Sequence, residues 1–335
     1  MNISDLEKYD LQKMYKVYDQ WPQIAKESFE SKQEYEYFEN VHHIVFAGMG
    51  GSGAIGDLFS AILSKTKIHV NVVKGYLLPK TTDSDSLVIV ISVSGNSMET
   101  ITILESAHKL GSKVIAFSSG GKIQEYCKKN NIKHKIIRKH HSPRAAFPAY
   151  VYSILKVFHK TLKIKQEEIF ESIKKLEMLN REINSSNLSN ENPSLSLAKW
   201  ISSTPIIYYP FGLQSAAIRF KNSLQENAKI HVFTEDVIEV CHNGIVAWEK
   251  KSNMLPILIE GQDDHFKTKE RWIILKEYFE HNGIRYKEIK SINGNILSKI
   301  MTLVYLLDYA SIYKAIIDQT DPSPVKSIDF IKKRL

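Results

Sequence analysis

The first part of the chain alternates short apolar runs with segments in which apolar residues recur at helical spacing. The apolar runs, rich in Val and Ile, are HHIVFA (42–47), HVNVV (69–73), LVIVIS (87–92), KVIAFS (113–118) and HKII (134–137). Helical spacing covers 53–65, 97–110 and 121–131. Short buried strands that alternate with helices predict a parallel β-sheet with helices on both faces.

A second α/β pattern follows a helical section. Helices are predicted over 149–162 and 166–184, and the polar stretch NSSNLSNENPS (184–194) marks a domain boundary. Beyond it, strands are predicted at 205–209, 255–260 and 284–289, and helices over 214–228, 266–282 and 295–317. The residues before His42 read as one helical stretch. The predicted organisation is an N-terminal helical segment (1–39), a first α/β domain (40–160), a connecting helix and linker (161–192), and a second α/β domain with a C-terminal helix and tail (193–335).

The two α/β halves share one local pattern. IVFAGMGGSGAIGDLFSAIL (44–63) and IIYYPFGLQSAAIRFKNSL (206–224) both run from a strand through a glycine-containing turn into a helix. Only the first turn is dense in glycine. We expect the first half to hold an anion and the second to present side chains.

Composition limits the class of protein. At 335 residues the chain is longer than a single hydrophobic core usually grows, which favours two domains. No uninterrupted apolar run approaches the ~20 residues of a spanning helix, so no membrane partner is expected. The N-terminal MNISDLEKYDLQK carries acidic residues and lacks the apolar core of a secretory signal. We therefore expect a cytoplasmic location.

Charge and the cysteine and histidine residues suggest neither nucleic acid nor a metal. The net charge is +8, but the densest basic stretch, KKNNIKHKIIRKHH (128–141), has no interleaved aromatic residues to stack on bases. A basic surface also suits an anionic small molecule. Cys127 and Cys241 lie far apart, and the two adjacent histidine pairs would point in opposite directions on a strand. We expect no nucleic-acid partner and no metal site.

The glycine-rich turn FAGMGGSGAIGD (46–57) matches G-x-G-x-x-G through Gly48, Gly50 and Gly53. A strand, a glycine turn and a helix N-terminus, here including Gly51 and Ser52, direct backbone N–H groups toward a phosphate. A dinucleotide site would also need an acidic residue about 20 positions on, but 69–76 reads HVNVVKGY. No G-K-[ST] follows for a nucleotide triphosphate. Another kind of phosphate is therefore favoured.

A second turn strengthens this interpretation. VSGNSMET follows the strand 87–92 and places Ser92, Ser94 and Ser97 at its carboxyl end, where small hydroxyls can donate to phosphate oxygens. Ser97 reads equally well as a plain helix N-cap. Ligands of open parallel sheets bind at the carboxyl ends of the strands, so the two turns together are more specific than either alone.

GMGGSGAIGD and SVSGNSMET together resemble the sugar isomerase (SIS) domain, whose members bind phosphosugars. SPRAAFP (142–148), FKNSLQENAK (220–229), CHNGIVAW (241–248) and DPSPVKSIDFIKKRL (321–335) further resemble the bifunctional phosphoglucose/phosphomannose isomerase family. The similarity extends from about residue 40 to the end. It implies an α/β fold of two SIS-type domains, each a parallel sheet flanked by helices on both faces.

The same resemblance implies catalytic residues. Glu226 stands at the position of the family's catalytic glutamate, although the residues alone favour an exposed helical glutamate paired with Lys221 or Lys229. His242 corresponds to the acid/base that opens the sugar ring, which the family donates from the neighbouring subunit. Arg144 corresponds to the cation beside the enediolate oxygen. A homodimer is therefore implied.

At three further positions the chain departs from the family pattern or allows a second interpretation. Ser97 stands where the family usually has threonine, a change that keeps the hydroxyl. Gly244 stands where an acidic residue usually follows His242 and Asn243, which puts the local positioning of the histidine in question. Lys332 matches a lysine that reaches the first domain's site, while a basic terminus is the alternative interpretation.

The expected function is an aldose–ketose isomerase that interconverts glucose 6-phosphate, fructose 6-phosphate and mannose 6-phosphate without metal or redox cofactor. One alternative is a phosphosugar-binding regulator, but the N-terminal stretch is too short and too acidic for a DNA-binding unit. Another is an aminosugar-phosphate isomerase related to glucosamine-phosphate synthase, for which a glutaminase domain would be expected. Hexose 6-phosphates are the expected small-molecule partners.

Overall fold

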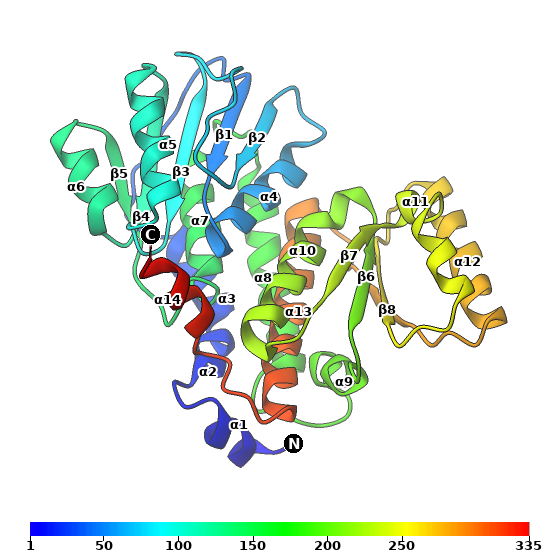
Figure 1. The fold of residues 1–335 in the computed structure, drawn as a ribbon. Coiled ribbons are helices and arrows are strands. Elements are labelled where there is room, and N and C mark those ends of the chain that lie inside the picture. Colours follow the sequence, from blue (N-terminus) through cyan, green and yellow to red (C-terminus); the bar gives the residue numbers. More distant parts are fainter. Residues whose placement is uncertain (335) are drawn as a thin grey trace. The chain divides into compact units, whose positions relative to one another are not determined.

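The computed structural model describes residues 1–334 and divides the chain into two compact units. One unit comprises 20–174 with 296–298, and the other comprises 1–19, 175–295 and the chain from 299 onward. Each unit holds one parallel sheet. Figure 1 follows the chain through both units by colour.

Five parallel strands form the first sheet in the order β2-β1-β3-β4-β5. Their bounds are His43–Ala47 (β1), His69–Val73 (β2), Leu87–Ser92 (β3), Lys113–Ser118 (β4) and Lys133–Ile136 (β5). All six residues of β3 are buried, as expected for a central strand covered on both faces. The five predicted strands are confirmed to within about one residue at each end.

Helices cover both faces of this sheet, and the alternation of side chains along the strands decides which residues meet them. On one face, Val45 and Val88 share a core cluster with residues of α5 (Met98–Lys109) and α6 (Gly121–Lys129). On the other face, Phe46 stacks on Phe59 of α4 (Gly51–Leu63), with ring centroids 5.2 Å apart. Helix α7 (Phe147–Phe158) packs on that same side, against α4 and α3 (Figure 1).

Four parallel strands form the second sheet in the order β7-β6-β8-β9. Their bounds are Pro205–Tyr209 (β6), Phe233–Asp236 (β7), Leu255–Glu260 (β8) and Lys287–Lys290 (β9). Tyr208 and Leu258 pack with Trp272 and Phe279 of α12 (Phe266–His281) on one face. Helix α10 (Gln214–Ser223) packs against β6 and β7. The chain is thus an α/β protein with two parallel sheets and flanking helices.

The remaining helical elements connect or extend the sheets. They are α1 (Ile3–Tyr9), α2 (Met14–Asp19), α3 (Trp21–Phe29), α8 (Gln166–Ile183), α9 (Pro193–Trp200), η1 (Phe211–Leu213), α10 (Gln214–Ser223), η2 (Leu224–Ala228), α11 (Val237–Val240), η3 (Gly244–Glu249), α12 (Phe266–His281), α13 (Ile296–Ile317) and α14 (Lys326–Lys332). Both glycine-containing turns join a strand to a helix, as the local repeat predicted.

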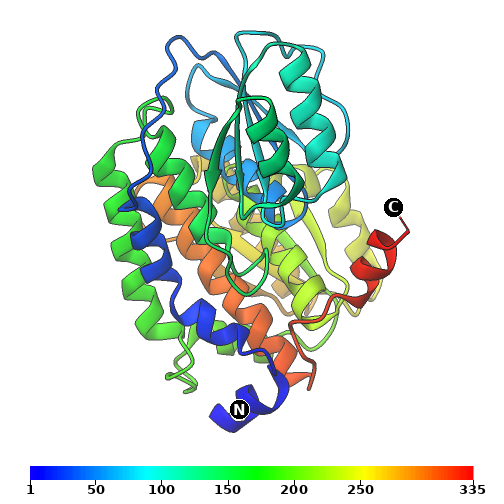
Figure 2. The same cartoon turned by 90° about the vertical axis from the view of Figure 1, so that its left-hand side faces the viewer.

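Helix α13 has the predicted bounds to within one residue, but it is more apolar than the sequence analysis expected. Its most apolar 18-residue window has a mean hydropathy of 1.5, which by length and composition alone would allow it to cross a membrane. However, 89% of that window is buried inside the protein, so α13 is best described as a core helix (Figure 2, orange). Tyr305, Tyr309 and Tyr313 lie four residues apart along it and donate hydrogen bonds to oxygen atoms of α2 and α8.

Two helical predictions need correction. The N-terminal stretch is three short helices rather than one, because the Asp10 carboxylate accepts a hydrogen bond from Tyr15 N at 2.8 Å and Lys13 adopts a left-handed φ of 56°. The helix predicted over 214–228 is α-helical only to Ser223 and continues as the π-helical turn η2. The short elements β7 and α14 carry too many charged residues for periodicity to reveal them.

Candidate active site

Three strands of the first sheet end in turns rich in serine and glycine. These are β1, β3 and β4, which lead into α4, α5 and α6. Because β1, β3 and β4 are adjacent and parallel, the three turns lie at the same edge of the sheet. The two turns predicted to bind phosphate are therefore brought together.

The glycine turn after β1 is built by close main-chain approach. Gly50 precedes α4 with φ 53°, in the region that favours glycine. A Cβ on Gly53 would lie 2.8 Å from Gly48 O, so the turn and the first helical residues fit only without side chains there. Gly51 begins α4, and Ser52 in its first turn is 5% exposed. The N-terminus of α4 thus presents main-chain N–H groups at the sheet edge.

The serine turn after β3 is organised by its own hydroxyl groups. Ser92 Oγ lies 3.3 Å from Ser97 Oγ and accepts a hydrogen bond from Gly95 N. Ser94 Oγ accepts from Asn96 N at 3.2 Å. Ser97 occupies the N-cap position of α5, but its side chain makes no cap hydrogen bond. Ser97 is therefore the N-cap residue of α5 by position, but its hydroxyl does not cap the helix.

The third turn was missed by the sequence analysis. Residues 118–122, SSGGK, pack against the serine turn, and a Cβ on Gly95 would lie only 1.8 Å from Gly120 O. Ser119 Oγ donates to Val93 O at 2.6 Å, and Lys122 N donates to the Asn96 side chain at 3.1 Å. Gly120 and Gly121, which closely follow the predicted strand 113–118, were the sequence signal that could have revealed this turn.

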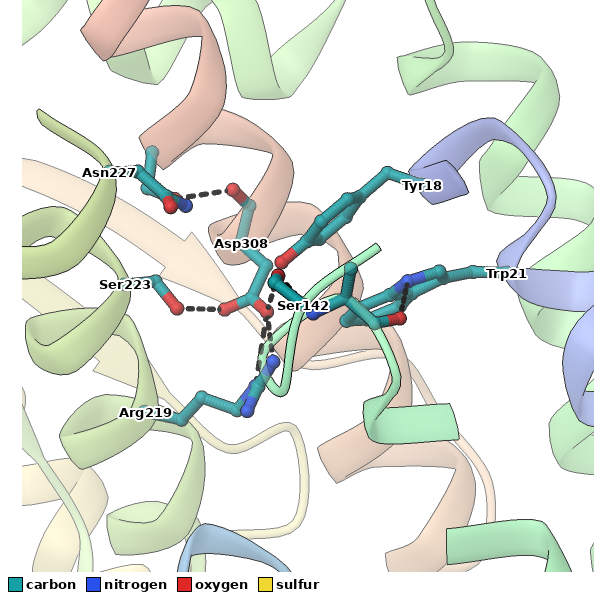
Figure 3. A network of polar contacts seen from close by, with 9 residues as sticks. Tyr18, Trp21, Ser142, Arg219, Ser223, Asn227 and Asp308 are labelled. Atoms are coloured by element: carbon teal, nitrogen blue, oxygen red, sulfur yellow. Dashed lines mark hydrogen bonds and ion pairs between the residues drawn. The ribbon is translucent and has the colours of Figure 1, made fainter. Parts of the chain in front are cut away.

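Arg144 is placed beside the glycine turn within the same unit. A Cβ on Gly51 would lie 3.4 Å from Pro143 O and 3.7 Å from Arg144 N. The segment is anchored from α3, where Trp21 Nε1 donates to Ala145 O at 3.0 Å (Figure 3). Arg144 itself is only 4% exposed. The structure thus brings the predicted phosphate residues and Arg144 together, and Trp21 is an anchor that sequence reasoning missed.

The end of β2 explains why this turn does not suit a dinucleotide. Where an acidic residue would bind ribose, Lys74 follows β2, and its Nζ lies 2.6 Å from Asp57 Oδ2 on α4. The Lys74 side chain also passes within 3.1 Å of the place where a Cβ of Gly53 would stand. The position is therefore filled by a cation that already has a carboxylate partner.

Glu226 lies in the other unit, in the π-turn η2 that follows α10. Such wider turns are rare and are found frequently at functional sites. The Lys229 side chain donates to the main-chain carbonyl of Glu226 and, at 2.8 Å, to Pro324 O. Lys229 thus joins this turn to the C-terminal tail, whose exposed Lys332 lies at the end of α14.

His242 is exposed and lies between α11 and η3 in the same unit as Glu226. Its neighbour Asn243 donates to Glu239 Oε1 at 2.7 Å. At Gly244, an added Cβ would lie 2.6 Å from Glu235 Oε1, so the Glu235 carboxylate fills the space of a side chain there. Burial, with a smaller contribution from Glu239, raises the pKa of Glu235. The family's acidic residue at 244 would place another carboxylate next to this one.

None of the predicted site residues lines the surface cavity found in the second sheet's unit. Within residues 1–334, no group of three or more His, Cys, Asp or Glu side chains is arranged to hold a metal ion. A surface cavity of about 700 Å³ is lined by residues of 202–203, 248–255 and 282–285 in the second sheet's unit. Residues 202–203 lie within three positions before β6 and residue 254 directly precedes β8, so this cavity lies at the amino ends of those strands.

Known proteins resemble the chain in both halves. The SIS domain model matches residues 37–158, and the bacterial phospho-glucose isomerase C-terminal SIS domain model matches residues 190–335. A bifunctional phosphoglucose/phosphomannose isomerase of Caldicellulosiruptor bescii is 33% identical over 307 residues, covering 89% of this chain and 90% of that protein. The chain belongs to the bifunctional phosphoglucose/phosphomannose isomerase family.

Further similarities support the family and the fold. The bifunctional phosphoglucose/phosphomannose isomerase of Aquifex aeolicus is 30% identical over 339 residues, covering 97% of this chain and 99% of that protein. Among solved structures, the C-terminal domain of glucosamine-fructose-6-phosphate aminotransferase from Francisella tularensis matches with a TM-score of 0.71 at 16% identity, covering 93% of this chain and 98% of that one. The predicted family and two-SIS-domain fold are confirmed, and the roles of individual site residues stay predictions.

Proposed function

We propose that the protein interconverts glucose 6-phosphate and fructose 6-phosphate, and mannose 6-phosphate and fructose 6-phosphate, as an aldose–ketose isomerase. The observation that carries the proposal is the placement of Arg144 beside the glycine turn, next to the serine turn at the same sheet edge. Membership of a family whose curated relatives are named for both activities supports it.

The phosphate is assigned to the first sheet's edge. Main-chain N–H groups at Gly50 and Gly51 and the hydroxyl of Ser52 would bind it together with the serines of the second turn. That set is completed by Ser92, Ser94 and Ser97. A bound phosphate fixes the reacting carbons relative to the catalytic groups, which accounts for a large part of the rate.

The chemistry is a proton transfer between adjacent carbons. The Glu226 carboxylate removes the C2 proton of the open-chain aldose, the C–H electrons form the C1=C2 bond, and the C1 carbonyl oxygen becomes the enediolate oxygen. After the O2 hydroxyl proton has moved to O1, return of the proton to C1 places the carbonyl at C2 and gives the ketose. Arg144 would stabilise the enediolate charge. Glucose and mannose 6-phosphate differ only at C2, so both pass through one enediol.

His242 and Lys332 complete the proposed site. A histidine titrates near neutral pH and can move the ring-opening proton in either direction. We assign His242 to the site of a second copy in a homodimer, and Lys332 to the substrate. The reaction involves no net redox change, so its chemistry requires no redox cofactor, and the proposed mechanism assigns the enediolate charge to Arg144 instead of a metal.

We also place the enzyme in the cytoplasm. Cys127 and Cys241 are both free thiols, as is usual for proteins of a reducing compartment. Fractionation of the source cells with an antibody would test this, and recovery of the protein with the secreted fraction would contradict it.

A coupled assay on fructose 6-phosphate tests the function. The purified protein, treated with chelator, is given fructose 6-phosphate, and formation of glucose 6-phosphate and of mannose 6-phosphate is measured separately. We expect both products. Glucose 6-phosphate alone would restrict the enzyme to phosphoglucose isomerase, and binding without turnover would favour the regulator.

A further inference from the structure

Three buried polar side chains lie four residues apart along α10 and η2, and therefore on one helical face. They are Arg219, Ser223 and Asn227, which are 2%, 3% and 0% exposed. Glu226 lies next to Asn227 in the π-turn. A polar face on a buried helix requires matching partners, because an unsatisfied polar group is costly in the interior.

Helix α13 supplies these partners through Asp308 and Ser311, both fully buried. Asp308 Oδ2 accepts from Arg219 Nη2 at 2.5 Å and from Arg219 Nε at 3.0 Å, and Asp308 Oδ1 accepts from Ser223 Oγ at 2.6 Å. Asn227 Nδ2 donates to Ser311 Oγ at 2.8 Å, and Ser311 Oγ donates to Asp308 O at 2.6 Å. We call these five residues the Asp308 network, of which Figure 3 labels Arg219, Ser223, Asn227 and Asp308.

The Asp308 network fixes the rotation and register of α10 on α13, which a purely apolar interface would leave adjustable. Hydrophobic packing is non-directional and tolerates small rotations of a helix about its axis. A forked guanidinium on one carboxylate, together with two hydroxyl hydrogen bonds, allows one rotation and one register of α10 on α13. The bond from Asn227 extends this restraint into the π-turn itself, one residue from Glu226.

Stability alone does not account for this arrangement. A buried ion pair is weak evidence for stability, because its desolvation cost is comparable to its attraction. Complete burial raises the pKa of the Asp308 carboxyl, while the charge of Arg219 and the hydrogen bonds oppose that shift. A catalytic base, by contrast, loses rate steeply when displaced by as little as about 1 Å.

We propose that the Asp308 network positions Glu226 for proton transfer. Asp308 is then a positioning residue that acts through the face of α10, and Ser311 acts through Asn227 on the π-turn. This inference rests on the proposed function, since it assigns the network to the base of that reaction.

Ser311→Ala tests the proposal with the full-length protein. Asp308→Asn would leave Arg219 buried beside a neutral amide and endanger folding, so the milder variant is used. The matched control is Ser194→Ala, because Ser194 is also fully buried and donates to α13, at Leu306 O, but from α9. We expect Ser311→Ala to lower kcat by about 10-fold or more with KM within about twofold, and Ser194→Ala to leave kcat unchanged at a similar loss in Tm.

A double-mutant cycle separates positioning from general damage. In a Glu226→Gln background, Ser311→Ala should have no further effect on kcat, because the group that it positions is gone. Multiplying effects, or equal kcat losses in Ser311→Ala and Ser194→Ala, would overturn the proposal. A wild-type protein without isomerase activity would instead refute the proposed function.

Hydrogen exchange supplies a readout that needs no turnover. The amides of 224–228 should exchange faster in Ser311→Ala than in the wild type, and at the wild-type rate in Ser194→Ala. Unchanged exchange in Ser311→Ala would show that the Asp308 network does not hold the π-turn, whatever the activity of the enzyme.

Discussion

At the scale of single residues, the proposed reaction assigns proton transfer to a carboxylate and phosphate binding to small hydroxyls. Glu226 occupies a π-turn and not a regular α-helix, and Lys229 contacts its main-chain carbonyl. Ser52 and Ser94 stand in separate turns at one sheet edge. Substitution of Glu226 should therefore lower kcat, whereas substitution of Ser52 or Ser94 should mainly raise KM.

Glu226→Gln should lower kcat by more than ~10²-fold, because the amide keeps the shape of the side chain but cannot accept the C2 proton. Steady-state kinetics on fructose 6-phosphate measures the effect. Glu277→Gln, at an exposed position on α12, is the control and should behave as wild type. Turnover by Glu226→Gln near the wild-type rate would remove Glu226 from the role of base.

Ser52→Ala and Ser94→Ala should each raise KM by roughly 10-fold and change kcat little, because a hydrogen bond to a charged phosphate is lost in ground and transition states alike. Ser106→Ala is the control, since its hydroxyl donates only within α5, to Thr102 O. If both KM and kcat stayed at their wild-type values, the two serines would not belong to the phosphate site.

At the scale of elements, helix α4 approaches the sheet so closely that its glycines have distinct tasks. A Cβ on Gly53 would meet Gly48 O at 2.8 Å, within the glycine turn after β1, whereas one on Gly56 would meet Val72 Cγ1 at 2.8 Å, on the sheet. Glycine is therefore needed for the shape of the turn at one position and for helix packing at the other. Substitution distinguishes the two tasks.

Gly53→Ala should raise KM because the turn must shift, whereas Gly56→Ala should destabilise the fold by about 1–3 kcal/mol through overpacking and leave KM near wild type. Denaturant unfolding and kinetics measure the two effects. Gly75→Ala, where a Cβ would meet nothing within 4 Å and φ is not positive, is the control. Equal KM values for Gly53→Ala and wild type would contradict this division.

Strand β5 contributes a pH-dependent contact to the sheet. His134 Nε2 lies 2.8 Å from Ser118 Oγ at the end of β4, and burial lowers the pKa of His134 below its ordinary value of 6.5. Between the lowered folded pKa and 6.5 the unfolded chain binds more protons, so the free energy of unfolding falls as pH decreases through this window. Protonation thus weakens the fold on the acidic side.

His134→Gln should therefore make Tm less sensitive to pH between about 5 and 7 than it is in the wild type. His140 and His159 also have pKa values lowered chiefly by burial, so part of the dependence should persist in the variant. Thermal melts of both proteins across this range give the difference. Parallel Tm curves would show that His134 does not contribute.

At the scale of the whole molecule, the proposed homodimer would explain why His242 is exposed, because its side chain would serve the site of the second copy. The segment around it carries exposed apolar residues, Ile238 on α11 and Val246 in η3, which are 37% and 55% exposed. Phe233, 55% exposed, lies on β7 at the edge of the second sheet. Exposed apolar residues of this kind suit contact with a second copy of the chain.

Mixing two inactive variants tests whether His242 serves the partner's site. Glu226→Gln and His242→Ala chains, co-refolded in equal amounts, should recover about a quarter of wild-type activity, because half of the dimers are mixed and each mixed dimer has one intact site. Each variant refolded alone is the control. No recovery, with mixed dimers demonstrated by mass, would place His242 in its own chain's site.

The sequence by itself determined the parallel sheets, the flanking helices and the glycine- and serine-rich turns, because these depend on local periodicity and on residue type at strand ends. Only the tertiary structure decided that Arg144 lies beside Gly51, that Trp21 anchors its loop, and that Glu235 fills the space at Gly244. It also decided that a predicted helix ends in a π-turn tied to Asp308 and Ser311. Most of these contacts join residues far apart in the chain, and their free energy depends on burial and on hydrogen-bond geometry that periodicity does not encode.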